Sequence, residues 1–154
     1  MNAAHLHLMS THLPVVGTLF GFCLYLFGWL RKNEDLKDLS LVIFILSLLL
    51  TVPAYLSGAA VAAAMMRMPN VTPELIEQHK ELAQLAFGAI GLLALLSLAG
   101  LIVFRKPRVY PCWFSLCVMV LTLAAGGLMG WTANKGAQVR HPEIRSPNDA
   151  GPQR

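Results

Sequence analysis

The sequence predicts an all-α membrane protein whose four transmembrane helices form an up-down-up-down bundle. Hydrophobic residues make up 56% of the chain and charged residues 13%, which lie above and below the usage of soluble domains. Four segments contain no Asp, Glu, Lys or Arg, namely 13–30, 39–66, 82–104 and 109–134. A helix needs about 20 apolar residues to cross the hydrocarbon core, so three segments are long enough, and the neutral Thr11 and His12 extend the first.

The expected elements follow from these segments and from local signals at their ends. The first span covers about 11–31, and the second covers 38–66 with a kink at Pro53, which cannot donate a backbone hydrogen bond. The third starts earlier than its charge-free segment, because Thr72 suits an N-cap and Pro73 suits the first helical position.

The third helix therefore runs over 73–104 and includes an extension beyond the outer membrane surface. The fourth span covers 109–134. The four spans form a single transmembrane domain over residues 1–144, and the polar residues 145–154 are predicted to form a flexible tail.

The orientation of the bundle is predicted from its basic residues. The loops 31–38 and 105–108 lie on one side of the membrane and hold half of the 12 Lys and Arg residues. Between the second and third spans the other side has only Arg67 and Lys80, although further basic residues follow the fourth span. The positive-inside rule places both termini on the extracytoplasmic side of a bacterial inner membrane.

Small residues are concentrated in the outer halves of the helices. Residues 57–64 and 124–130 are nearly all Gly, Ala or Ser, and Gly17 and Gly21 lie in the outer half of the first span. Small side chains let membrane helices approach closely. The same composition also suits a space kept open for a flat prosthetic group, and both interpretations stay open at this stage.

All five histidines fall at the outer face of the expected bundle. His12 opens the first span and His79 lies near the outer end of the third helix, and these two helices are expected to be diagonal. Diagonal helix axes about 13 Å apart leave room for two imidazoles to hold one iron between them. We therefore predict that His12 and His79 are the axial ligands of a haem b iron.

The other histidines suggest a second or alternative metal site. His5 and His7 form an HxH pair which, with nearby methionines, would suit copper, and His141 follows the fourth span. Arg140 beside it is a candidate contact for a haem propionate, because guanidinium binds carboxylates in a bidentate geometry.

The run His12-Leu13-Pro14, the small-residue-rich second helix, His79 and the Gly-rich fourth helix together resemble a known pattern. The chain resembles, to about residue 144, an uncharacterised family of small bacterial four-helix membrane proteins for which haem b binding has been suggested. A more distant likeness is to four-helix membrane cytochromes b. The resemblance implies a bis-histidine haem site at His12 and His79, although Leu13 separates the histidine from the proline of the family motif.

These observations predict a haem b-binding electron-transfer protein or a subunit of a membrane redox complex. A cofactor-free structural accessory subunit and an outward-facing copper-binding protein are the alternatives. No independent catalytic activity is expected, since the sequence has no phosphate loop or HExxH motif. The expected partners are the lipid bilayer and other subunits of a redox complex. A nucleic-acid partner is not expected, because no stripe of basic and aromatic residues is present.

Overall fold

The computed structural model describes residues 3–67, 71, 73–106 and 109–141, and these fold into four helices. The helices are α1 (Ala3–Leu30), α2 (Glu34–Met65), α3 (Pro73–Val103) and α4 (Cys112–Arg140). All four are long and apolar enough to cross a membrane. The all-helical prediction is confirmed, and the predicted tail 145–154 lies outside the described residues.

Three helices are longer at one end than the sequence suggested, and α2 is one of them because it begins at Glu34 instead of residue 38. Helix α1 begins at Ala3 instead of near residue 11, and α4 continues to Arg140 instead of ending near residue 134. Both extensions contain a residue of the candidate site described below. The extension of α1 also changes the expectation for the HxH pair, because positions two apart in a helix do not face each other. The His5 side chain is outside the described part of the structure, so the predicted chelation by the HxH pair stays a prediction.

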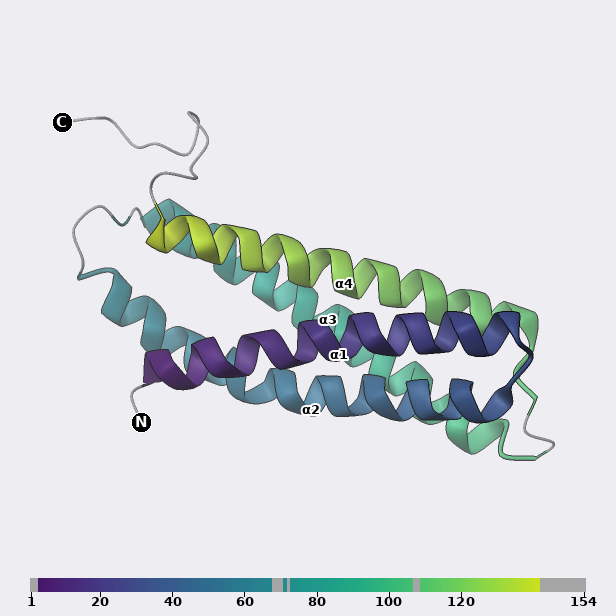
Figure 1. Ribbon diagram of the computed structural model, residues 1–154. Coiled ribbons are helices and arrows are strands. Elements are labelled where there is room, and N and C mark those ends of the chain that lie inside the picture. The colour runs from purple at the N-terminus through teal and green to yellow at the C-terminus, as the bar shows by residue number, and fades with distance from the viewer. Residues whose placement is uncertain (1–2, 68–70, 72, 107–108, 142–154) are drawn as a thin grey trace.

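The helices pack as two adjacent pairs. Helix α1 packs against α2 and α4, and α3 packs against α2 and α4. Within the described part of the chain, α1 and α3 make no helix–helix contact, and neither do α2 and α4, so these pairs are diagonal. Figure 1 shows the start of α1 and the end of α4 at the same end of the elongated molecule, where the α1–α2 pair diverges from the α3–α4 pair.

Two buried apolar clusters occupy the two ends of the bundle. The larger one fills the end near the α1–α2 and α3–α4 loops and includes Tyr25, Phe44, Leu93 and Phe114. A smaller cluster lies near the chain termini and consists of Met65, Leu75, Ile76 and Val139. The candidate site lies in the bundle between these two clusters.

The helix ends near the loops are defined by local hydrogen bonds and charges. Asn33 caps α2, because its side-chain oxygen accepts a hydrogen bond from the Leu36 backbone N–H at 3.1 Å. Glu34 and Asp35 follow in the first turn, where negative charge interacts favourably with the helix dipole. This cap fixes where α2 starts, and hence which of its residues face α1.

The glycines of α1 confirm the close-packing interpretation for the α1–α2 pair. A Cβ atom added at Gly17 would lie 2.6 Å from the Ser47 hydroxyl, and one at Gly21 would lie 2.6 Å from Phe44. These glycines let the two helix backbones approach. The glycines near the middle of α3 and of α4 differ, because an added Cβ would meet nothing within 4 Å at Gly88, Gly91, Gly126, Gly127 and Gly130.

Candidate cofactor site

Two adjoining cavities lie in the half of the bundle near the chain termini. Their volumes are about 360 and 630 Å³, which is the size range of pockets that hold small molecules and cofactors. His7 and His79 line both cavities. The smaller one is also lined by Tyr55 and Phe87 of α2 and α3, and the larger one by Val16 and Ala137 of α1 and α4. The two histidines therefore stand where the cavities meet.

His7 is held against α2 by hydrogen bonds to one ring nitrogen. Its Nδ1 lies 2.9 Å from the Ala54 carbonyl oxygen and 3.1 Å from the Ser57 hydroxyl. The Ser57 hydroxyl itself donates to the carbonyls of Pro53 and Ala54, at 2.8 and 3.0 Å. The Ser57 oxygen can therefore accept from His7, and the Nδ1 proton is shared between the two oxygens.

His79 is held against α4 in the same manner. Its Nδ1 lies 2.9 Å from the Thr132 carbonyl oxygen. The Thr132 hydroxyl donates to Leu128 within its own helix, at 2.8 Å, so it does not compete for the imidazole. Each helix pair thus supplies one histidine whose Nδ1 is fixed by a backbone carbonyl of its neighbouring helix.

A glycine four residues after each accepting carbonyl makes room for the imidazole. A helical side chain covers the turn that precedes it, so a large residue at i+4 would shield the carbonyl of residue i. Gly58 follows Ala54 and Gly136 follows Thr132 by four residues. A Cβ atom added at Gly136 would lie 3.0 Å from the His79 ring, and one at Gly58 would lie 3.7 Å from the His7 ring.

These hydrogen bonds determine which nitrogen of each ring can bind a ligand. A carbonyl oxygen only accepts hydrogen bonds, so Nδ1 must carry the proton in both rings. In a neutral imidazole the lone pair is then on Nε2. Histidines that ligate metals commonly have this arrangement, in which one nitrogen donates to a carbonyl and the other is the ligand. The two rings also lie within electrostatic range of each other.

The remaining wall of the cavities is mainly apolar. Small residues of α2 and α4, such as Ala62 and Ala133, line both cavities, as does Ile76 of α3. Tyr55 and Phe87 stack across α2 and α3, with ring centroids 4.5 Å apart and planes inclined by 18°. The small residues predicted from the sequence thus leave space around the two histidines, which agrees with the open-space interpretation for this part of α2 and α4.

The other predicted site residues occupy different positions. His12 is exposed on α1, where its Nδ1 lies 3.4 Å from the Thr11 hydroxyl, and it lines only the larger cavity. His141 is exposed at the end of α4 and also lines that cavity. The side chains of His5 and Arg140 are outside the described part of the structure. His7, which the sequence assigned to a second site, therefore shares both cavities with His79, whereas His12 shares only the larger one.

A bare metal ion has too few ligands here. Among the described residues, no group of three or more His, Cys, Asp or Glu side chains could hold a metal ion. Two imidazoles suit a group that brings its own equatorial ligands.

The position of His7 at the cavities has a signal in the sequence. His7 is seven residues before Pro14, and the segment around it continues as a helix into the first span. The glycines beside the two histidine rings, Gly58 and Gly136, occupy matching positions in α2 and α4. Comparisons of the chain with protein families, with curated proteins and with solved structures found no match.

Proposed function

We propose that this protein binds haem b between His7 and His79 and transfers electrons at the outer side of a bacterial inner membrane. The observation that carries the proposal is the paired arrangement of the two imidazoles. Each has its Nδ1 proton on a backbone carbonyl, each has its Nε2 lone pair left for a ligand, and both line the same two cavities.

The residues present fit haem by their chemistry. Histidine is a common protein ligand of haem iron, and His7 and His79 would hold the haem through their imidazoles. The ligands come from the diagonal helices α1 and α3, which do not contact each other in the described structure. The cavities on either side of the histidine pair lie along the α2–α3 and α1–α4 interfaces. A flat group between the two helix pairs would occupy both.

The protein side of the mechanism follows from the same contacts. The carbonyls of Ala54 and Thr132 fix the orientation of the two rings and strengthen Nε2 as a ligand. The apolar wall lowers the local polarity, a property that tunes the reduction potential of such a site. Haem b would supply reversible one-electron exchange, and two protein ligands would leave no open position for a substrate. Electron transfer is therefore the activity that we propose.

His7 replaces His12 in this proposal for a physical reason. An axial ligand needs its ring fixed and pointed into the bundle, and His7 has both an inward position and two oxygens that hold Nδ1. His12 is exposed, and its Nδ1 lies 3.4 Å from the hydroxyl of the adjacent Thr11. We assign to His12 a place at the rim of the larger cavity.

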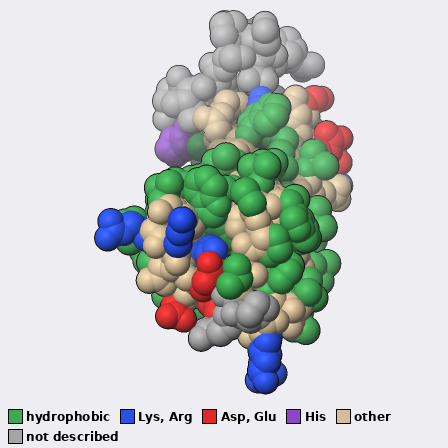
Figure 2. Space-filling model, turned by 90° about the vertical axis from the view of Figure 1, so that its right-hand side faces the viewer, with side chains coloured by type: hydrophobic (Ala, Val, Ile, Leu, Met, Phe, Trp, Pro, Cys, Tyr) green, Lys and Arg blue, Asp and Glu red, His purple; other side chains and the backbone are tan. Residues whose placement is uncertain are grey.

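We also propose that the helices cross the inner membrane in up-down-up-down order, with both termini outside the cytoplasm. Basic residues gather at the end opposite the cavities, where Arg31, Lys32, Arg105 and Lys106 are exposed. Figure 2 views this end and shows Lys and Arg side chains around it, over a largely hydrophobic surface. An excess of Lys and Arg marks cytoplasmic loops.

The test is a visible spectrum of the purified protein after supply of haem, recorded for three single variants. We expect His7→Ala and His79→Ala to lose the bands of reduced bis-histidine haem, and His12→Ala to keep them. Circular dichroism checks that each bundle remains helical. A colourless wild type that contains neither iron nor porphyrin would refute haem binding. Loss of haem from His12→Ala, with retention in His7→Ala, would restore the pair predicted from sequence. Metal analysis of the same preparations tests the copper alternative.

One observation favours a second function, that of an accessory subunit in a larger membrane complex. Five glycines of α3 and α4 have nothing within 4 Å of an added Cβ, so packing inside the bundle does not require them. Glycines on an outer helix surface suit close docking of another membrane helix. Co-purification of this chain with larger subunits, weakened by Gly127→Leu, would support this role. It is compatible with haem binding.

A further inference from the structure

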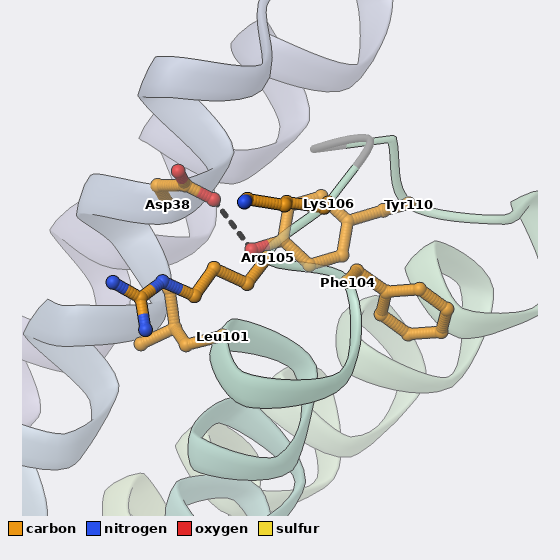
Figure 3. A pocket seen from close by; sticks show the side chains of 6 residues that line it. All are labelled: Asp38, Leu101, Phe104, Arg105, Lys106 and Tyr110. Atoms are coloured by element: carbon orange, nitrogen blue, oxygen red, sulfur yellow. Dashed lines mark hydrogen bonds between the residues drawn. The ribbon is translucent and has the colours of Figure 1, made fainter.

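A second pocket lies at the opposite end of the bundle and is unrelated to the histidines. Its volume is about 340 Å³, and it is lined by Asp38 of α2, by Leu101 of α3, and by Phe104, Arg105, Lys106 and Tyr110 between α3 and α4. Figure 3 shows Arg105 and Lys106 extending from the end of α3 toward α2, where Asp38 lies. The pocket therefore combines an apolar wall with two cations.

The acidic groups beside this pocket are already engaged within the protein. The Tyr110 hydroxyl donates a short hydrogen bond to the Asp38 carboxylate. Glu34 pairs with Lys37 at 2.6 Å and also accepts from the Tyr110 backbone N–H at 3.4 Å. The Lys37 ammonium lies 5.5 Å from the centre of the Tyr110 ring, and Lys37 is only 4% exposed. Around Tyr110, the Glu34 carboxylate is therefore paired with Lys37, and the Asp38 carboxylate is hydrogen-bonded to the Tyr110 hydroxyl.

Arg105 and Lys106 are in the opposite situation. Both side chains are exposed, and within the described part of the chain neither forms an ion pair or a hydrogen bond. They come two and three residues after Val103, where α3 ends, and α3 is a candidate membrane span. Two unpaired cations at the end of a span lie at the depth of lipid headgroups, where basic residues attract anionic lipids.

We propose that this pocket binds the phosphate of an anionic phospholipid. Arg105 and Lys106 would contact the phosphate oxygens, since guanidinium and ammonium groups both bind phosphate strongly. Leu101 and Phe104 form the apolar wall against which the start of an acyl chain packs. The Asp38 carboxylate would repel the headgroup less than a free carboxylate, because it accepts a hydrogen bond from the Tyr110 hydroxyl.

The α1–α2 loop at the same end of the molecule provides a matched control. Arg31 and Lys32 are also exposed, but they do not line the pocket. The Arg31 guanidinium lies 5.9 Å from the centre of the Phe27 ring. Replacing Arg31 and Lys32 removes the same charge from the same end of the bundle as replacing Arg105 and Lys106. A difference between the two double variants therefore reports the pocket and not the net charge.

The experiment titrates detergent-solubilised full-length protein with phosphatidylglycerol and counts bound lipids by native mass spectrometry. We expect Arg105→Gln/Lys106→Gln to weaken the first bound lipid about tenfold or more, and Arg31→Gln/Lys32→Gln to weaken it less than about threefold. Phosphatidylcholine should bind more weakly to the wild type. All the substituted side chains are exposed, and circular dichroism confirms that the variants fold.

Two outcomes would overturn the proposal. Equal losses in the two double variants would show that overall charge, and not this pocket, attracts the lipid. Displacement of the first lipid by excess inorganic phosphate, with phosphate retained in its place, would show that the ligand is free phosphate. Neither outcome depends on haem, so this site and the proposed redox function fail independently.

Discussion

Replacing one glycine at each histidine should produce different results, although the substitution is the same. Gly58→Ala and Gly136→Ala each add one methyl group beside an imidazole. The added Cβ would lie 3.7 Å from the His7 ring at position 58, which is ordinary contact. At position 136 it would lie 3.0 Å from Cε1 and 3.2 Å from Nδ1 of His79, so the ring must move by a few tenths of an ångström.

The magnitudes follow from these distances. Ala is more favourable than Gly inside a helix by about 0.5–1 kcal/mol, so Gly58→Ala should raise the melting temperature of the cofactor-free protein by about 2–4 °C. Gly136→Ala gains the same stabilisation of the helix by Ala, but it strains the 2.9 Å hydrogen bond between His79 Nδ1 and the Thr132 carbonyl oxygen. A neutral hydrogen bond contributes about 1 kcal/mol, so the two effects should nearly cancel in stability.

Cofactor affinity should separate the two variants more clearly. If haem is held as proposed, weakening the hydrogen bond that orients the His79 ring by about 1 kcal/mol should raise the Kd for haem about fivefold in Gly136→Ala. Gly58→Ala should bind haem like the wild type. The assay is a haem titration in detergent followed by visible absorbance, alongside thermal unfolding by circular dichroism. Equal Kd values for Gly136→Ala and the wild type would refute the role of the Thr132 carbonyl in orienting His79.

Three further predictions concern the rest of the bundle. The buried Ser47 hydroxyl has no hydrogen-bond partner among the described residues, so Ser47→Ala should raise the free energy of unfolding by about 1 kcal/mol. A clear loss of stability in denaturant unfolding would contradict this. Gly21→Ala should lower the free energy of unfolding by about 1–3 kcal/mol because its Cβ would press on Phe44, whereas Gly127→Ala should not lower it. Equal effects of the two substitutions in the same assay would show that the α1–α2 contact does not matter. Burial, and then the hydrogen bond to Asp38, raise the pKa of Tyr110 above its ordinary value of 10.0. Ionisation of Tyr110 should therefore leave the free energy of unfolding constant below about pH 10 and should lower it as the pH rises from there toward the folded-state pKa. An ultraviolet titration in which Tyr110→Phe removes no late-titrating tyrosine would contradict the assignment.

Some of this site could be read from the sequence. The charge-free segments predicted four long apolar helices, because span length depends mainly on local composition. The sequence also placed His79 on the apolar stripe of its helix, and in the structure His79 lines both cavities. Small residues in α2 and α4 indicated space around it.

The partner of His79 could not be read in the same way. His7 lies before the charge-free segment, so composition gave no reason to extend α1 back to Ala3, and His12 was the first histidine inside the expected span. The choice depends on the rotation of α1 about its axis, which is set by packing of Gly17 and Gly21 against α2. That packing turns His7 toward Ala54 and leaves His12 exposed.

By itself, then, the sequence determined the number of helices, their apolar character and the end of the bundle where the histidines gather. Only the tertiary structure decided which imidazole faces which, because a hydrogen bond between His7 and Ala54 joins residues 47 positions apart, and one between His79 and Thr132 joins residues 53 apart. Hydropathy is a property of neighbouring residues along the chain. The direction of a ring nitrogen depends on the carbonyl that a different helix brings to it.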